Sequence, residues 1–258
     1  MRTFMIRPII TLALFGLLCM AVEARAESSK TQPDSLIADR THLPGQGMIT
    51  YRVALGDSNF EIGRTSNEWK IEKGRYHLKS IARTTGLARL LRPTFVVMES
   101  RGRITPEGLR PDTFVVRQGD DPVREWAEFD WKNMKIRVGE QPEQNLKAGS
   151  QDLLSFNYNF GFMPDAASAG SLFVTTGKRY RNYPISFVAR GEIETPAGKF
   201  KTLHLRTSGE NTTELWLAYD YWLLPVKIRH VDKRGGSFVQ AVTEIRVDSE
   251  KKIQGGAD

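Results

Sequence analysis

The sequence is poor in the residue types that carry common enzyme chemistry. It has one cysteine and four histidines in 258 residues. Cys19 lies in an N-terminal segment that we expect to be removed, so the remaining chain has no thiol for a disulfide, a nucleophile or a metal site. The G-x-S-x-G turn of serine hydrolases, the H-E-x-x-H zinc motif and glycine-rich phosphate loops are also missing. These absences favour a protein without catalytic residues, metal or cofactor.

The first residues have the pattern of an export signal. Arg2 and Arg7 form a positive region, Ile9 to Val22 are uncharged and mostly apolar, and residues 24–26 read small-x-small. The apolar run has fourteen residues, which is shorter than the roughly 18 that span a bilayer. We therefore expect a signal peptide of residues 1–26, cleaved after Ala26, and a periplasmic protein.

The charge balance excludes one class of partner. Removing residues 1–26 takes three basic and one acidic residue from totals of 37 and 30, which leaves a net charge of +5. Such a surface suits anionic lipid headgroups, acidic glycans or an acidic protein, and it is equally common on a solvated surface without a partner. The chain has no block of five or six basic residues, so we expect no nucleic-acid binding.

Most of the chain has the period-two pattern of β-strands. Tyr51, Val53 and Leu55 alternate with polar or small residues, and short turn signals such as 195–198 separate runs of this kind. About ten to twelve strand candidates follow one another, a number at which a twisted sheet curls. We predict a mainly β fold, a single curved antiparallel sheet or half-open β-barrel with one or two short helices. The boundaries are a leader at 27–46, one β-rich domain at 47–248 and a tail at 249–258.

One segment has helical spacing instead. Leu153, Phe156 and Phe160 lie on one face of a predicted short helix over residues 151–161, and Asp152 is placed to cap it. The apolar stripe needs a partner, which a barrel mouth or the concave side of a sheet provides. Gln151 and Asp152 are candidate ligand-binding residues, although a helix cap explains the same pair.

The stretch TELWLAYDYWLLPVKI, Thr213 to Ile228, is the most apolar part of the domain. Its charges and Pro225 exclude a membrane helix, and it predicts a hairpin that turns around residues 219–222. Trp216, Tyr221 and Trp222 carry large apolar bodies with polar groups. They are candidates for a cavity rim, and core packing is the alternative.

The segment at 86–93 is basic and amphipathic. Leu87, Leu90 and Leu91 can share one helical face, with the arginines elsewhere. We take these leucines as candidate ligand-binding residues in a lip that touches an anionic membrane or gates a cavity. The alternative is that they plug the end of the barrel as core.

Several segments together resemble a known family. TPAGKF at 195–200 and the ELWLAYDYWLLPVKI run, with RITPEGLRPDTFVV at 103–116 and QDLLSFNY at 151–158 before them, are similar to the bacterial exported family called domain of unknown function 3108. The resemblance implies a β-rich envelope domain without an established activity, and it supplies no catalytic residues. A further likeness, to half-open barrels that carry lipoproteins or lipids, is one of architecture.

Three functional hypotheses follow. The first is a non-catalytic binding, carrier or chaperone-like barrel for an apolar, lipid-like ligand in the cell envelope. The second is a hydrolase or lyase acting on an envelope polymer, with Asp130, Asp152 and Asp220 as its candidate carboxylates. The third is an interaction module whose strand edge or basic face docks a partner protein of an envelope complex.

Overall fold

A computed structural model describes residues 43–248, apart from 57, 59, 87–88, 90–93, 120–122, 124, 164–165, 167–169 and 210. These residues belong to one compact unit of the chain, Asp34–Asp258. The predicted signal segment, most of the leader and the tail lie outside the described residues.

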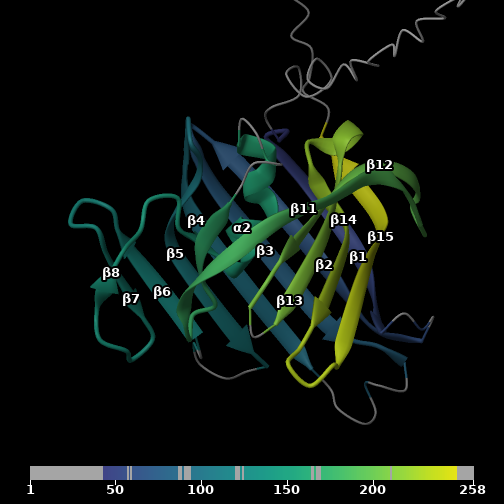
Figure 1. Ribbon diagram of the computed structural model, residues 1–258, viewed down its shortest axis with the longest axis horizontal. Coiled ribbons are helices and arrows are strands. Elements are labelled where there is room, and N and C mark those ends of the chain that lie inside the picture. The colour runs from purple at the N-terminus through teal and green to yellow at the C-terminus, as the bar shows by residue number, and fades with distance from the viewer. Residues whose placement is uncertain are drawn as a thin grey trace, which may run out of the picture. The chain divides into compact units, whose positions relative to one another are not determined.

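Fifteen strands form one sheet in this part of the chain (Figure 1). Their order is β8-β7-β6-β5-β4-β3-β2-β1-β15-β14-β13-β12-β11-β10-β9. The strands are β1 (Gln46–Leu55), β2 (Glu61–Glu72), β3 (Arg75–Thr84), β4 (Phe95–Thr105), β5 (Gly108–Gln118), β6 (Glu125–Asp130), β7 (Lys135–Val138), β8 (Gln144–Asn145), β9 (Gln151–Asp152), β10 (Ser171–Thr175), β11 (Tyr180–Thr195), β12 (Gly198–Thr207), β13 (Thr212–Ala218), β14 (Leu224–Val231) and β15 (Ser237–Val247).

The prediction of a mainly β fold built on one curved, unclosed sheet is confirmed. The predicted number of strands is too low, because β8 and β9 have two residues each and a run of two has no period to detect. The sheet is also not wholly antiparallel, since β9 pairs in parallel with β10. The other pairs are antiparallel and join strands that are consecutive in the chain, as short turn signals predict, except that β1 pairs with β15.

The two ends of the sheet approach each other without forming a ladder. The Trp126 N–H donates to the Gly177 carbonyl over 3.3 Å, and Lys178 pairs with Glu125 at 2.5 Å. The Gln151 side-chain nitrogen donates to the Leu109 carbonyl over 2.7 Å. Isolated bonds of this kind connect β5 and β6 to the segments around β9 and β10. They hold the curvature of an almost closed barrel while leaving strand edges unpaired.

The predicted helix is present and lies on the concave side of the sheet. It consists of α2 (Leu153–Asn159), which continues as the 3-10 turn η1 (Phe160–Phe162). The helix touches β3, β4 and β5 on one side and β10 and β14 on the other. In Figure 1 it lies inside the curve formed by these strands. The helix therefore packs against strands of both halves of the sheet, which provide the partner that its apolar stripe needs.

Two apolar clusters meet at this helix. Leu154 and Tyr158 belong to a cluster with residues of β1 to β7 and of β12 to β15. Phe156 and Phe160 belong to a second cluster with residues of β10 to β14. The fully buried large side chains that fill the interior are Ile49, Tyr51, Leu78, Phe114, Ile136, Leu154, Tyr158, Phe160, Leu205, Leu215, Leu217 and Leu224. The concave face is thus occupied by the protein's own side chains.

The apolar stretch at 213–228 forms the predicted hairpin. β13 ends at Ala218, the 3-10 turn η3 (Tyr219–Tyr221) follows, and β14 begins at Leu224. Trp222 and Leu223 close the turn with φ values of +52° and +54°, a left-handed conformation that non-glycine residues seldom adopt. Among the described residues, no helix is long and apolar enough to cross a membrane.

Candidate binding site

A buried polar network attaches the start of α2 to the sheet. The Asp152 carboxylate accepts hydrogen bonds from the Ser100 hydroxyl at 2.5 Å, from the Leu154 N–H at 2.9 Å and from the Ser155 N–H at 2.8 Å. The Ser155 hydroxyl accepts in turn from the Asp152 N–H, which completes a capping box. Tyr76 lies 3.2 Å from the Ser100 hydroxyl. Asp152 therefore caps the helix, as its position in the sequence indicates.

Burial changes the acidity of this carboxyl group. Asp152 is wholly buried, and the loss of solvation raises its pKa to about 6, although Ser100, Ser155 and Leu154 favour the ionised form by hydrogen bonding. Ser100 is also inaccessible to solvent. The buried carboxylate, serine and tyrosine together hold the start of α2 against β3 and β4.

Gln151 is equally buried, next to Asp152. Its side-chain nitrogen donates to the carbonyls of Leu109 and Gly149, at 2.7 and 3.2 Å. The Leu109 carbonyl lies at the start of β5, where β6 does not pair with it, and the Gln151 side chain provides its hydrogen-bond donor. The two residues thus lie in one place, inside the protein.

The three aromatic candidates lie elsewhere. Trp216 stacks on His204 with ring centres 4.1 Å apart and carries the Lys227 ammonium 4.8 Å from its ring centre. Tyr221 packs edge-on against Phe200 and Trp222. Trp222 is packed against the first apolar cluster. The described part of the chain does not gather these candidates with Gln151 and Asp152 around one cavity. Leu87, Leu90 and Leu91 lie outside the described residues.

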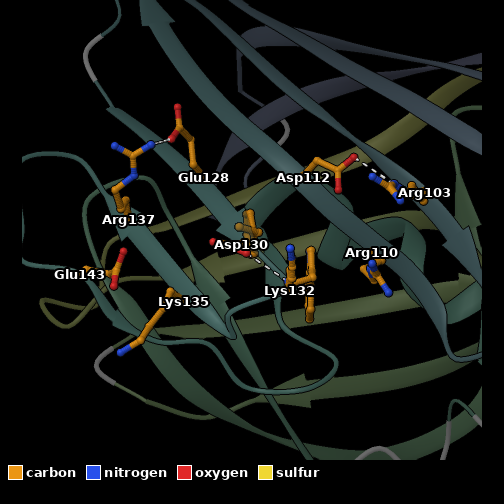
Figure 2. Close-up of a pocket in the computed structure, with 11 residues that line it drawn as sticks. Arg103, Arg110, Asp112, Glu128, Asp130, Lys132, Lys135, Arg137 and Glu143 are labelled. Carbon is orange, nitrogen blue, oxygen red and sulfur yellow. Dashed lines mark hydrogen bonds and ion pairs between the residues drawn. The ribbon is translucent and has the colours of Figure 1, made fainter.

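A charged pocket opens where two strands separate. β5 and β6 pair only from Thr113–Glu128 to Val116–Glu125, and their other ends diverge. In this gap the Trp131 indole N–H donates a hydrogen bond to the Pro111 carbonyl of β5 over 2.6 Å. The space beside it has a volume of about 500 Å³ (Figure 2). Its lining residues are Arg103, Arg110, Asp112, Glu128, Phe129, Asp130, Trp131, Lys132, Lys135, Arg137 and Glu143.

Three of the four carboxylates of this pocket, those of Asp112, Glu128 and Asp130, are engaged by neighbours. Glu128 pairs with Arg137, Asp112 pairs with Arg103, and Asp130 accepts from the N–H groups of Lys132 and Asn133 (Figure 2). The hydrogen bonds from Asn133 hold the pKa of Asp130 below its ordinary value. A glycosidase needs one carboxyl group that stays protonated, and these bonds oppose that state for Asp130. The lining of the pocket is mainly charged.

The candidate carboxylates of an enzyme are not assembled. Asp152 is buried, Asp130 is exposed at the end of β6, and Asp220 lies in η3. Within the described ranges, no group of three histidine, cysteine or acidic side chains is placed to hold a metal ion.

The middle of β11 is another candidate site, because one edge of the strand has no paired strand among the described residues. This strand pairs with β10 only through Tyr180–Pro184 and with β12 only from Ile185 onward. No strand among the described residues pairs with its other edge after Ile185. Seven successive residues, Ser186 to Glu192, are exposed, including Phe187 at 47% and Val188 at 39%. We call this segment, Ser186–Glu192, the free edge.

Sequence reasoning missed the free edge and most of the polar network. Ser80 and Ser100 occupy buried positions of β3 and β4. Ser80 follows Tyr76 and Leu78 at a spacing of two, so the sequence pattern could have indicated a polar residue on the buried face of β3. No local pattern could reveal the free edge, since which strand ends lack a neighbour depends on pairing across the whole sheet.

These features define a class of protein: an open, β-barrel-like domain whose concave side is filled by its own helix and whose accessible sites are polar or lie at strand edges. The family model described as "Protein of unknown function (DUF3108)" matches residues 50–243. The chain belongs to this family, and the resemblance seen in the sequence is confirmed.

A solved structure supports the fold, and two others are more distantly similar. The β-barrel-like protein of the domain of unknown function DUF1849 from Brucella abortus is similar at a TM-score of 0.53 and 10% identity, over 80% of this chain and 99% of that one. A putative lipoprotein from Parabacteroides distasonis matches at a TM-score of 0.35 and 10% identity, over 79% and 97%. MucB matches at a TM-score of 0.34 and 14% identity, over 86% and 61%. No curated protein matches the sequence.

Proposed function

We propose that the protein is a non-catalytic binding module of the cell envelope, exported to the periplasm, that docks an extended segment of a partner protein along the free edge of β11. The observation that carries this proposal is the segment Ser186–Glu192, whose seven residues are exposed and which, among the described residues, pairs with a strand on one edge only. The backbone groups of such an edge pair readily with an added strand.

The side chains of the free edge specify what kind of segment fits. Phe187 pairs with Leu205 of β12, and the exposed Val188 follows it in the chain. Val188 is the extra residue of a bulge relative to β12, and a bulge limits indiscriminate pairing between edges. A partner strand with apolar side chains covers both residues. The partner is therefore an extended, apolar segment of another protein.

Carriage of an apolar, lipid-like ligand is less well supported by the geometry. The apolar lining that such a ligand needs is the concave face, where Phe156 of α2 and Phe160 of η1 share a buried cluster with Leu205 and Leu215. The pockets of about 500, 430 and 330 Å³ are lined mainly by polar and charged residues, whereas ligand pockets of this kind are mostly apolar. A ligand would have to displace the helix.

Photocrosslinking from the free edge tests the docking proposal. A photoreactive phenylalanine analogue replaces Phe187 in cells that make the protein, and the crosslinked peptide is identified by mass spectrometry. We expect one discrete adduct with an extended apolar segment of another protein. Val188→Lys should lower its yield about tenfold, since burying a valine contributes about 1.5 kcal/mol and 1.4 kcal/mol is a factor of ten.

The matched control is Phe238 on β15, which is 42% exposed but has a strand on each side. The analogue at Phe238 should give no such adduct. The docking proposal fails if Phe187 gives no adduct, if Phe238 gives the same one, or if the adduct is a second copy of this chain. Native mass spectrometry with lipid extraction tests the alternative of a lipid carrier. A stoichiometric lipid retained by the purified protein identifies a carrier.

A further inference from the structure

A second group of exposed apolar side chains gathers at one end of the sheet. Leu55 at the end of β1 is 50% exposed and pairs across the ladder with Phe238 at the start of β15. Phe60, before β2, is 54% exposed, and its carbonyl accepts from the Leu55 N–H. Phe95 at the start of β4 is 36% exposed. We call these four residues the apolar rim.

The adjacent strands place the rim residues along one line. β15, β1, β2, β3 and β4 are consecutive neighbours in the sheet (Figure 1). Hydrogen bonds join their connections, from the Gly56 N–H to the Ser237 carbonyl and from the Thr85 N–H to the Ile62 carbonyl. At about 4.8 Å between strands, the rim is about 20 Å long.

The charges beside the rim are mainly positive. The described residues of 55–64, 83–95 and 231–238 include five basic and two acidic side chains, a net charge of +3. Both acids are engaged: Glu61 pairs with Arg64, and Asp232 accepts from the N–H groups of its own turn. Arg83 lies 4.9 Å from the centre of the Phe95 ring. Arg89, Lys233 and Arg234 are exposed.

We infer that the apolar rim is a peripheral membrane contact that inserts into the surface of an anionic bilayer. Exposed phenylalanine and leucine side chains enter the boundary between headgroups and acyl chains, and basic residues around them bind anionic headgroups. The positive surround favours a lipid surface over an apolar protein patch, which would leave these charges unmatched. The rim and the free edge of β11 use different residues, so this inference does not depend on the docking proposal.

Co-sedimentation of the purified protein with vesicles tests the inference. We expect binding to vesicles of phosphatidylglycerol and phosphatidylethanolamine to be at least tenfold tighter than to phosphatidylcholine vesicles, and to weaken as salt is raised. The double variant Phe60→Ser, Phe238→Ser should bind anionic vesicles about tenfold more weakly, because both apolar anchors are lost.

The matched control is Phe187→Ser, which removes a phenylalanine of similar exposure, 47%, from the free edge. It should bind vesicles like the unaltered protein. Circular dichroism and thermal unfolding identify any variant that has lost its fold, and Arg89→Gln, Lys233→Gln then provides the second test. The inference is overturned if neither vesicle type binds, if both bind equally, or if Phe187→Ser loses as much binding as the rim variant.

Discussion

Replacing Gly102 by alanine should lower the free energy of unfolding by about 3 kcal/mol, near the upper end of the usual cost of overpacking. An added Cβ would lie inside van der Waals contact with the Arg110 carbonyl oxygen, 2.7 Å from Pro111 Cα and 2.8 Å from Tyr76 Cε1. Two of these atoms belong to the backbone of β5 and cannot swing away. The midpoint of thermal unfolding should fall by about 6 to 12 °C, as expected for a domain of this size.

Gly191 provides the matched control for this substitution. It is also a strand glycine, on β11, but no atom lies within 4 Å of an added Cβ. Gly191→Ala should leave the thermal midpoint unchanged or raise it slightly, because glycine is a poor strand residue. Equal midpoints for the two variants, measured by calorimetry, would show that β4 and β5 are not packed this closely. The added methyl group would also displace the Tyr76 ring, whose hydroxyl lies beside Ser100 in the polar network.

Much of the fold could be predicted because its cause is local. Period-two alternation predicts the individual strands, and short turn signals predict that consecutive strands pair. The spacing of Leu153, Phe156 and Phe160 predicts a helix and its need for an apolar partner. Strands of two residues and the parallel pairing of β9 with β10 could not be predicted, because tertiary bonds position them. The Gln151 side chain, for example, bonds to the end of β5.

The candidate sites were less predictable, since they depend on contacts between distant segments. The capping role of Asp152 is local and could be read directly, whereas its bond to Ser100 joins residues 52 positions apart. Glu128 and Asp130 share a strand face in the sequence, but their pocket exists because β5 and β6 separate. The exposure of β11 follows from where β10 stops pairing with it. Such an ending has no signature of its own in the sequence.

The stability of the protein should carry a pH dependence that disappears in Asp152→Asn. The folded pKa of Asp152 is about 6, above the ordinary value of 3.8. Between these values the folded protein holds a proton that the unfolded chain has released, so the unfolding free energy falls as pH rises from about 4 to about 6. The two values differ by about two pH units, which corresponds to about 3 kcal/mol. Urea unfolding of the wild type and of Asp152→Asn at pH 4 and pH 7 measures this change in the free energy of unfolding.

Asparagine suits this comparison because its carbonyl can still accept from the N–H groups of Leu154 and Ser155, so the cap is kept. The unfolding free energy of the wild type minus that of the variant should therefore decrease by about 3 kcal/mol from pH 4 to pH 7. Asp130→Asn is a control of opposite sign, since the pKa of Asp130 is lowered and its contribution is lost as pH falls. A difference that is flat or rises with pH for Asp152 would mean that its carboxyl group is not buried at the start of α2.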